Sequence, residues 1–198
     1  MTSKPEDKIA RIISSILLPP FTLFASYLIL AYSPKPVPPH STLLTLISFC
    51  MLVLFPIIVF IYLFKKKKIS DQDTLIRSER NLPFLIGILL TLAGLLSHLF
   101  VSFENTLLFG FWVSATAGSI AVYVVNRFWK ISAHLLFFSI AVADIAILIN
   151  SNYFYLFLLL PMLWWSRVKL KSHDALQLGV GMAVGFIISL ISSYIKSV

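Results

Sequence analysis

Two histidines in this sequence each stand beside a cation at the start of an apolar run. His134 lies in "WKISAHLLF" after Lys130, and His173 lies in "SRVKLKSHDALQLGVG" after Arg167. Because imidazole titrates near neutral pH, one ring can be neutral while the other is protonated. With cations that hold oxygen anions, such a pair is suited to binding a phosphate.

A third segment, "RSERNLPF", has the same arrangement of cation and apolar run, with Arg80 followed by Pro83. Proline suits the first turn of a helix, where its missing N–H costs little. The unpaired N–H groups and the dipole at a helix start favour anions. If the three helices pack together, we expect their starts to form a phosphate-binding cup.

The composition places these segments in a membrane protein. The chain has 198 residues, 59% of them hydrophobic, and a mean hydropathy of +0.92, which is more apolar than soluble domains are. The net charge of +8 therefore indicates topology and lipid phosphates rather than nucleic acid. The single cysteine, Cys50, cannot form an internal disulfide. We expect one integral membrane domain over residues 1–198, without a cofactor, and the oligomeric state stays open.

Apolar runs predict an all-α bundle of transmembrane helices. Crossing the hydrocarbon layer takes about 20 helical residues. The runs are Ile12–Tyr32, Leu43–Phe64, Phe84–Phe103, Thr106–Asn126, Ser132–Ile149, Tyr153–Trp165 and Ala175–Tyr194. This gives about seven spans, or six if the short Tyr153–Trp165 run does not cross.

Lysine and arginine fall mainly on one side of this predicted bundle. That side comprises the N-terminus and the connections 65–81, 127–131 and 166–174, with fourteen of the sixteen basic residues. The other side comprises Ser33–Ser41, the turns near Glu104 and Asn150, and the C-terminus, with only Lys35 and Lys196. By the positive-inside rule, we expect the N-terminus and all three polar segments on the cytoplasmic side of the inner or cell membrane.

These segments carry a resemblance to the type 2 phosphatidic acid phosphatase superfamily. Its last signature is S-R, five residues, H, three residues, D. Ser166, Arg167 and His173 match this signature, but Gln177 stands at the aspartate position. The family's P-S-G-H signature is matched at Ser132 and His134, with Ile131 and Ala133 in place of the proline and glycine.

The first segment resembles the family's K-x6-R-P signature more loosely. Arg80 is present, and Pro83 follows it by three residues instead of one. The lysine position holds Asp73. The resemblance covers roughly Arg77 to Gly185, with the segments in the family's order. Two predicted spans lie between the first two segments, where the family usually has none.

The resemblance implies a metal-independent mechanism through a phosphohistidine. His173 would be the nucleophile, and His134 would protonate the leaving oxygen. The phosphoryl oxygens would be held by Arg80, Arg167, Lys130 and Ser132. Gln177 lies one helical turn after His173, so its carbonyl can orient the ring but supplies no charge.

The predicted function is therefore that of a phosphatase acting on a membrane lipid phosphate or an isoprenyl diphosphate. One alternative is a lipid phosphotransferase that passes the phosphoryl group to an alcohol. Another is a non-catalytic lipid-binding or scaffold protein of the same fold, which the substitutions at Ile131, Ala133 and Gln177 favour.

Other polar or small residues have structural interpretations. Asp144 lies in a predicted span about 15 Å of helix from His134, so we expect a structural polar contact there. Gly181 and Gly185 form G-x-x-x-G, which is typical of close helix packing. The "SDQD" stretch at Ser70 holds two carboxylates, which is weak support for a metal, and we expect none.

Overall fold

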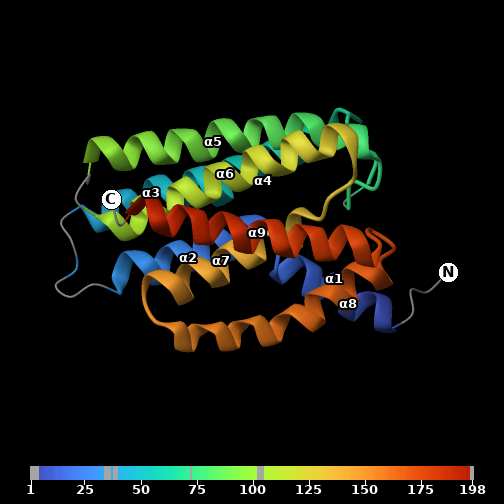
Figure 1. Ribbon diagram of the computed structural model, residues 1–198. Helices are drawn as coiled ribbons and strands as arrows, with labels where there is room; N and C mark the ends of the chain where they lie inside the picture. Colours follow the sequence, from blue (N-terminus) through green and yellow to red (C-terminus); the bar gives the residue numbers. More distant parts are fainter. Residues whose placement is uncertain (1–4, 34–36, 38–39, 72, 102–104, 197–198) are drawn as a thin grey trace.

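The structure is a computed structural model that describes residues 5–33, 37, 40–71, 73–101 and 105–196. These residues are helical and include no strand, so the all-α prediction is confirmed (Figure 1). The expected turn at Glu104 and most of the proline-rich loop lie outside the described residues. The elements are α1 (Pro5–Ile16), α2 (Pro19–Tyr32), α3 (Ser41–Phe49), the π-helix η1 (Cys50–Leu54), α4 (Phe55–Lys65), the 3₁₀ helix η2 (Arg77–Arg80), α5 (Asn81–Val101), α6 (Thr106–Phe128), α7 (Ala133–Leu148), the 3₁₀ helix η3 (Ser151–Leu159), α8 (Leu160–Lys169) and α9 (Ala175–Lys196).

The described helices support an integral membrane bundle but not the expected count of about seven spans. Four are long and apolar enough to cross a membrane, namely Ser41–Lys65, Arg77–Val101, Thr106–Phe128 and Ala175–Tyr194. The pair α1 and α2 makes a fifth if it is one span bent by 45°. Large apolar side chains cover the outside of the bundle; Ile58 and Leu89, for example, are both more than half exposed, as lipid contact requires.

Breaks in helical regularity explain the lower count. Proline removes a backbone donor and clashes with the preceding turn, and Pro19 and Pro20 begin α2 after the bend. The expected span Ser132–Ile149 forms only the 16-residue α7, which at 1.5 Å per residue is about 24 Å long. The Tyr153–Trp165 run is divided between η3 and α8.

Helix α7 occupies the centre of the bundle and packs most extensively on α9 and on α2. Gly181 and Gly185 allow this close approach, because a Cβ atom at Gly185 would lie 2.2 Å from the carbonyl oxygen of Leu136. The G-x-x-x-G prediction of close helix packing is thus confirmed within the chain. On the α6 side of α7, the Ser114 hydroxyl donates to Asp144 over 3.0 Å, which is the structural polar contact expected there.

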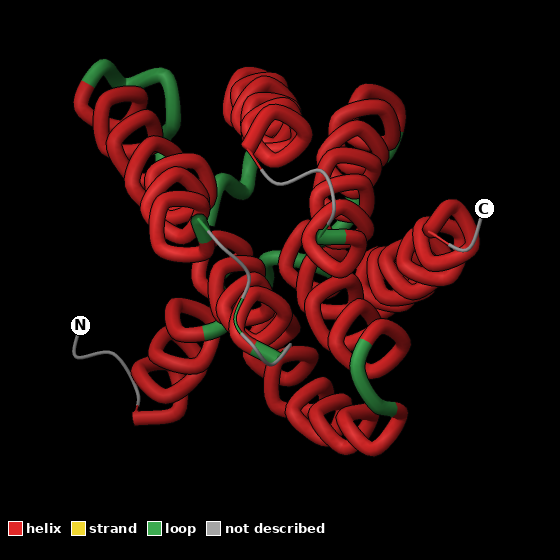
Figure 2. The backbone as a smooth tube through the Cα atoms, turned by 90° about the vertical axis from the view of Figure 1, so that its left-hand side faces the viewer, coloured by secondary structure: helices red, strands yellow, loops and turns green. Residues whose placement is uncertain are grey.

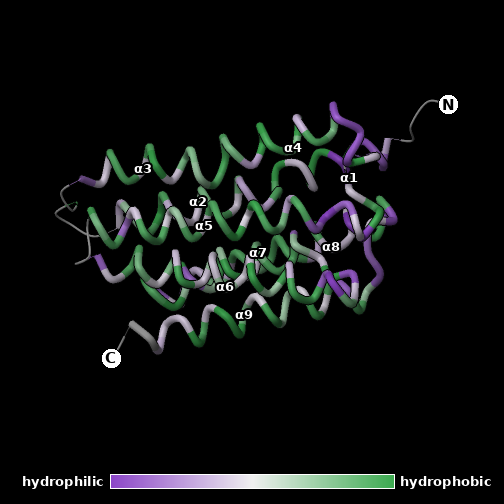
Figure 3. The backbone as a smooth tube through the Cα atoms, turned by 90° about the horizontal axis from the view of Figure 1, so that it is seen from above, coloured by the Kyte–Doolittle hydropathy of each residue, from purple (hydrophilic) through white to green (hydrophobic). Residues whose placement is uncertain are grey.

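The helices run roughly along a common direction, as the view down the bundle shows (Figure 2). The N- and C-termini lie at opposite ends (Figure 1). Hydrophilic residues gather at the end near the N-terminus, where α4 leads to α5 and α8 leads to α9 (Figure 3). The three polar segments of the sequence therefore meet at one end of the bundle.

Candidate active site

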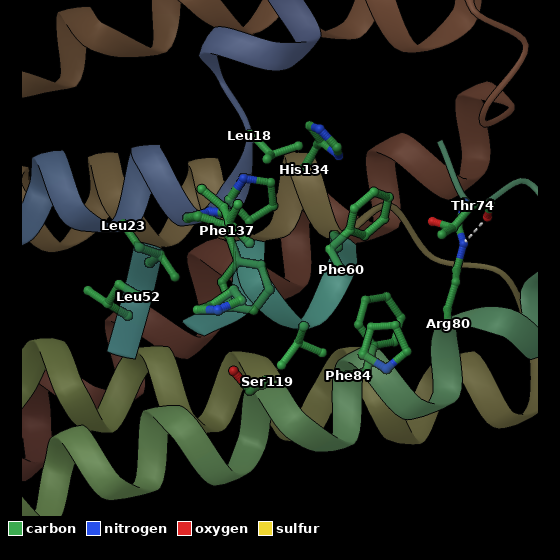
Figure 4. A pocket seen from close by; sticks show the side chains of 18 of the residues that line it. Leu18, Leu23, Leu52, Phe60, Thr74, Arg80, Phe84, Ser119, His134 and Phe137 are labelled. Atoms are coloured by element: carbon green, nitrogen blue, oxygen red, sulfur yellow. Dashed lines mark hydrogen bonds between the residues drawn. The ribbon is translucent and has the colours of Figure 1, made fainter. Parts of the chain in front are cut away.

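A cavity of about 490 Å³ opens at this polar end and continues between the helices. Arg80 and His134 lie toward its polar end, whereas Leu23 and Leu52 lie in its apolar part (Figure 4). The polar lining also includes Arg11, Ser14, Asp73, Thr74, Arg167 and His173. The apolar part is bounded by α2, by η1 and α4, and by α5. The cavity thus combines a polar end that holds cations with an apolar part between the helices.

His173 is positioned by the short connection between α8 and α9 and by the first turn of α9. Its Nδ1 lies 2.9 Å from Oε1 of Gln177. Since a carbonyl oxygen can only accept, Nδ1 carries the proton and Nε2 holds the lone pair in the neutral ring. Burial and the positive charge of Arg80 lower the pKa of His173 to about 3. The ring is thus neutral at physiological pH, as a nucleophile must be.

Asp174 fixes the orientation of Gln177. The Gln177 side-chain nitrogen donates to Asp174 Oδ2 over 2.8 Å, and the Gln177 backbone N–H donates to Asp174 Oδ1 over 2.8 Å. Asp174 therefore both caps the start of α9 and forces the Gln177 carbonyl toward His173. The Asp174 carboxylate is thus connected to the His173 imidazole through the side-chain amide of Gln177.

Arg80 is buried at the end of η2, and its guanidinium is held mainly by backbone carbonyl groups. Nε donates to Thr74 over 2.6 Å, Nη2 donates to Asp73 over 3.2 Å, and Nη1 lies 3.4 Å from the carbonyl oxygen of Ile131. The same Nη1 lies 3.4 Å from Nε2 of His173. Arg80 thus joins the 73–74 turn to Nε2 of His173.

Arg167 is the second buried guanidinium, only 2% exposed. Its Nη1 donates to the Ser14 hydroxyl over 2.6 Å and to Asp73 Oδ1 over 2.9 Å. Its Nε has no hydrogen-bond partner among the described residues. This Nε is covered by protein atoms, so it does not face the cavity.

Ser14 and Asp73 are site residues that sequence reasoning did not identify. Ser14 Oγ lies 3.5 Å from Nε2 of His134, so it connects this ring to Arg167. Nothing in the sequence around Ser14 distinguishes it from other helical serines. In the sequence, Asp73 stands at a lysine position of the K-x6-R-P signature and is one of the two carboxylates of "SDQD", and neither feature predicts a contact with Arg167.

Lys130 and Ser132 do not line the cavity. The Ser132 hydroxyl caps α7 by accepting from the Leu135 N–H, and its own N–H donates to the Gln177 carbonyl over 3.4 Å. The hydroxyl and the N–H of Ser132, a residue expected to bind phosphate, therefore both form hydrogen bonds within the protein. Lys130 is half-buried, and its burial and the charges of Arg80 and Arg167 lower its pKa. Lys130 therefore influences the charged groups of the cavity through its electrostatic field and not by direct contact.

Comparison of the chain with known protein families, with characterised proteins and with solved structures found no match. The geometry of the cavity is therefore the basis for assigning a function. Among the described residues, no group of three or more His, Cys, Asp or Glu side chains is placed to hold a metal ion.

Proposed function

We propose that the protein is a membrane lipid phosphatase that acts on a lipid phosphate or an isoprenyl diphosphate through a phosphohistidine intermediate. One observation carries the proposal: His134, His173, Arg80 and Arg167 line the polar end of a single cavity whose other end is apolar. A ligand with an anionic head and a hydrocarbon tail matches both ends.

In the proposed first step, Nε2 of His173 attacks phosphorus while the bond from phosphorus to the leaving oxygen breaks. Gln177 holds the Nδ1 proton, which directs the lone pair on Nε2 into the cavity. Arg80 and Arg167 bind the non-bridging oxygens, where charge builds up in the transition state. His134 donates a proton to the leaving oxygen, and the negative phosphate beside it favours this protonated form.

In the second step, His134 accepts a proton from water as the water oxygen attacks the phosphohistidine. The P–N bond breaks, inorganic phosphate leaves, and His173 returns to its neutral form. A positioned acid–base group of this kind contributes about 10²–10⁴-fold to the rate.

The charge distribution supports placing this site at the cytoplasmic face of the cell membrane. The connections at the polar end hold most of the lysine and arginine, and such residues are retained on the cytoplasmic side. The substrate would then come from the cytoplasmic leaflet, with its tail entering beside α4 and α5.

A second function, non-catalytic binding of a lipid phosphate, is favoured by two observations. Gln177 supplies no charge to His173, and Asp73 already pairs with Arg167 in the cup. Both features weaken catalysis more than they weaken binding.

Phosphate release by the purified protein separates these functions. Lysophosphatidate, phosphatidate and a prenyl diphosphate in detergent are suitable substrates. We expect release from at least one, abolished in His173→Ala and retained in His40→Asn. His40 is an exposed histidine at the other end of the bundle, with a positive φ that asparagine tolerates.

Labelled substrate should leave an alkali-stable, acid-labile phosphoryl group on the wild-type protein. If release required an added alcohol, the protein would be a phosphotransferase. If no substrate released phosphate, or if His173→Ala matched the wild type, the catalytic proposal would be refuted.

A further inference from the structure

The carboxylate of Asp73 borders the cavity at the place where a phosphate would bind. Its Oδ1 lies 2.9 Å from Nη1 of Arg167, and its Oδ2 lies 3.5 Å from Nη1 of Arg11. An acidic group inside a phosphate site is unexpected, because it repels any fully ionised anion. It must therefore either block the site or select among anions.

The turn that bears Asp73 is fixed by Arg80. The Arg80 guanidinium donates hydrogen bonds to the backbone carbonyl groups of both Asp73 and Thr74. Thr74 has a φ of 46°, which is strained for a β-branched residue and persists only where its surroundings enforce it. The Asp73 carboxylate is thus fixed at the cavity wall by the same arginine that touches His173.

Arg167 lines the cavity beside Asp73, and its guanidinium contacts the Asp73 carboxylate through Nη1. A phosphate oxygen that approaches this guanidinium from the cavity would lie beside the same carboxylate. A second oxygen of the same phosphate would then come close to the carboxylate. Such an approach is favourable only if that oxygen carries a proton to donate.

From this arrangement, and resting on the proposed function, we infer that Asp73 determines specificity by accepting a hydrogen bond from a protonated phosphate oxygen. Inorganic hydrogen phosphate carries such a proton, and a phosphate monoester carries one in its monoanionic form. The phosphodiesters of ordinary membrane lipids and sulfate esters do not. A site built to pair with a ligand hydroxyl rejects analogues that lack it, because its own polar group is then left buried and unpaired.

This role explains how a cationic site within a membrane could remain unoccupied by ordinary membrane lipids. Arg11, Arg80 and Arg167 alone would attract any lipid phosphate, including the abundant diesters. With Asp73 among them, the oxygens of a diester face a carboxylate to which they cannot donate a hydrogen bond.

Hydrogen phosphate and sulfate provide the sharpest probes, since at mildly alkaline pH both are tetrahedral and carry about two negative charges. Only hydrogen phosphate has a proton to donate. Titration calorimetry of the purified protein in detergent should show phosphate bound roughly tenfold to a hundredfold more tightly than sulfate, the consequence of leaving one buried acceptor unpaired.

Asp73→Asn should reduce this preference to within about threefold, because an amide can also donate to sulfate. Asp71→Asn is the matched control: it removes the same charge from the same loop, but Asp71 does not line the cavity. It should keep the wild-type preference.

Equal binding of both anions by the wild type, or an unchanged preference in Asp73→Asn, would overturn the role of Asp73 while leaving the phosphatase proposal intact. A wild type that binds neither phosphate nor a lipid phosphate would refute both.

Discussion

Exchanging the carboxylate and the amide beside the nucleophile tests whether Gln177 controls His173. The double variant Asp174→Asn with Gln177→Glu keeps the hydrogen-bond chain but moves the negative charge one side chain closer to the imidazole. Gln177→Glu alone would set two carboxylates against each other, since the two side chains now meet at 2.8 Å. The asparagine amide removes that conflict by donating to Glu at position 177.

The size of the effect follows from the distance. The accepting oxygen at position 177 lies 2.9 Å from Nδ1 of His173, and an opposite charge this close raises the pKa of a base by about 1–3 units. The pKa of His173 should therefore rise from about 3 into the range of roughly 4–6. This corresponds to about 1.4–4 kcal/mol of added preference for the protonated ring. At neutral pH the ring stays mostly neutral, and it becomes more basic.

Histidine-selective NMR of the detergent-solubilised protein measures this directly, because the chain has only four histidines. The His173 signal is assigned by its loss in a His173 variant. If phosphate release is observed, the acidic limb of its pH–rate profile should shift to higher pH by the same amount. A pKa that shifts by less than half a unit would show that Gln177 does not hold the ring, and the reasoning from this contact would fail.

Three further predictions concern stability and topology. Lowering the pH from 7 to 5 should cost about 2 kcal/mol of stability through His173, because its ring takes up a proton only on unfolding; thermal unfolding should show a smaller acid loss in His173→Asn. Gly185→Ala should lower the unfolding temperature clearly, since its Cβ would meet a backbone carbonyl of α7 at 2.2 Å, whereas Gly87→Ala, with nothing within 4 Å, should leave it unchanged or slightly higher. Cysteines placed at the exposed Ser70 and His40 should label oppositely with an impermeant thiol reagent in intact cells, with only the one at His40 reacting; the reverse pattern would place the polar end outside.

The convergence of the two histidines and two arginines could be anticipated because each stands at a helix boundary on the same side of the predicted bundle. Hydropathy and charge bias determine which side a boundary lies on, and helices of similar length then bring the boundaries together. Gln177 was predictable as the partner of His173 for a local reason, since four residues make one helical turn.

Residues contributed by other segments could not be found this way. Ser14 reaches Arg167 only because α1 packs on α8, and no periodicity encodes that contact. Asp73 depends on a turn with a strained backbone. Asp174 is connected to His173 through the amide of Gln177 and not by direct contact, which the sequence does not indicate. The described helices include four or five candidate spans instead of about seven, because hydropathy marks apolar runs but not where a helix is short, as α7 is, or broken, as before Pro19.

The hydrogen bond between Ser14 and Arg167 joins residues 153 positions apart in the chain. A chain emerging from the ribosome therefore inserts α1 long before the helix that will complete its contacts. Before α8 and the start of α9 are synthesised, the chain lacks Arg167 and His173. Ser14, Asp73 and His134 therefore have no partner from the C-terminal part of the chain. The growing protein consequently passes through membrane insertion without the complete lining of this cavity, and the proposed binding of phosphate requires the finished chain.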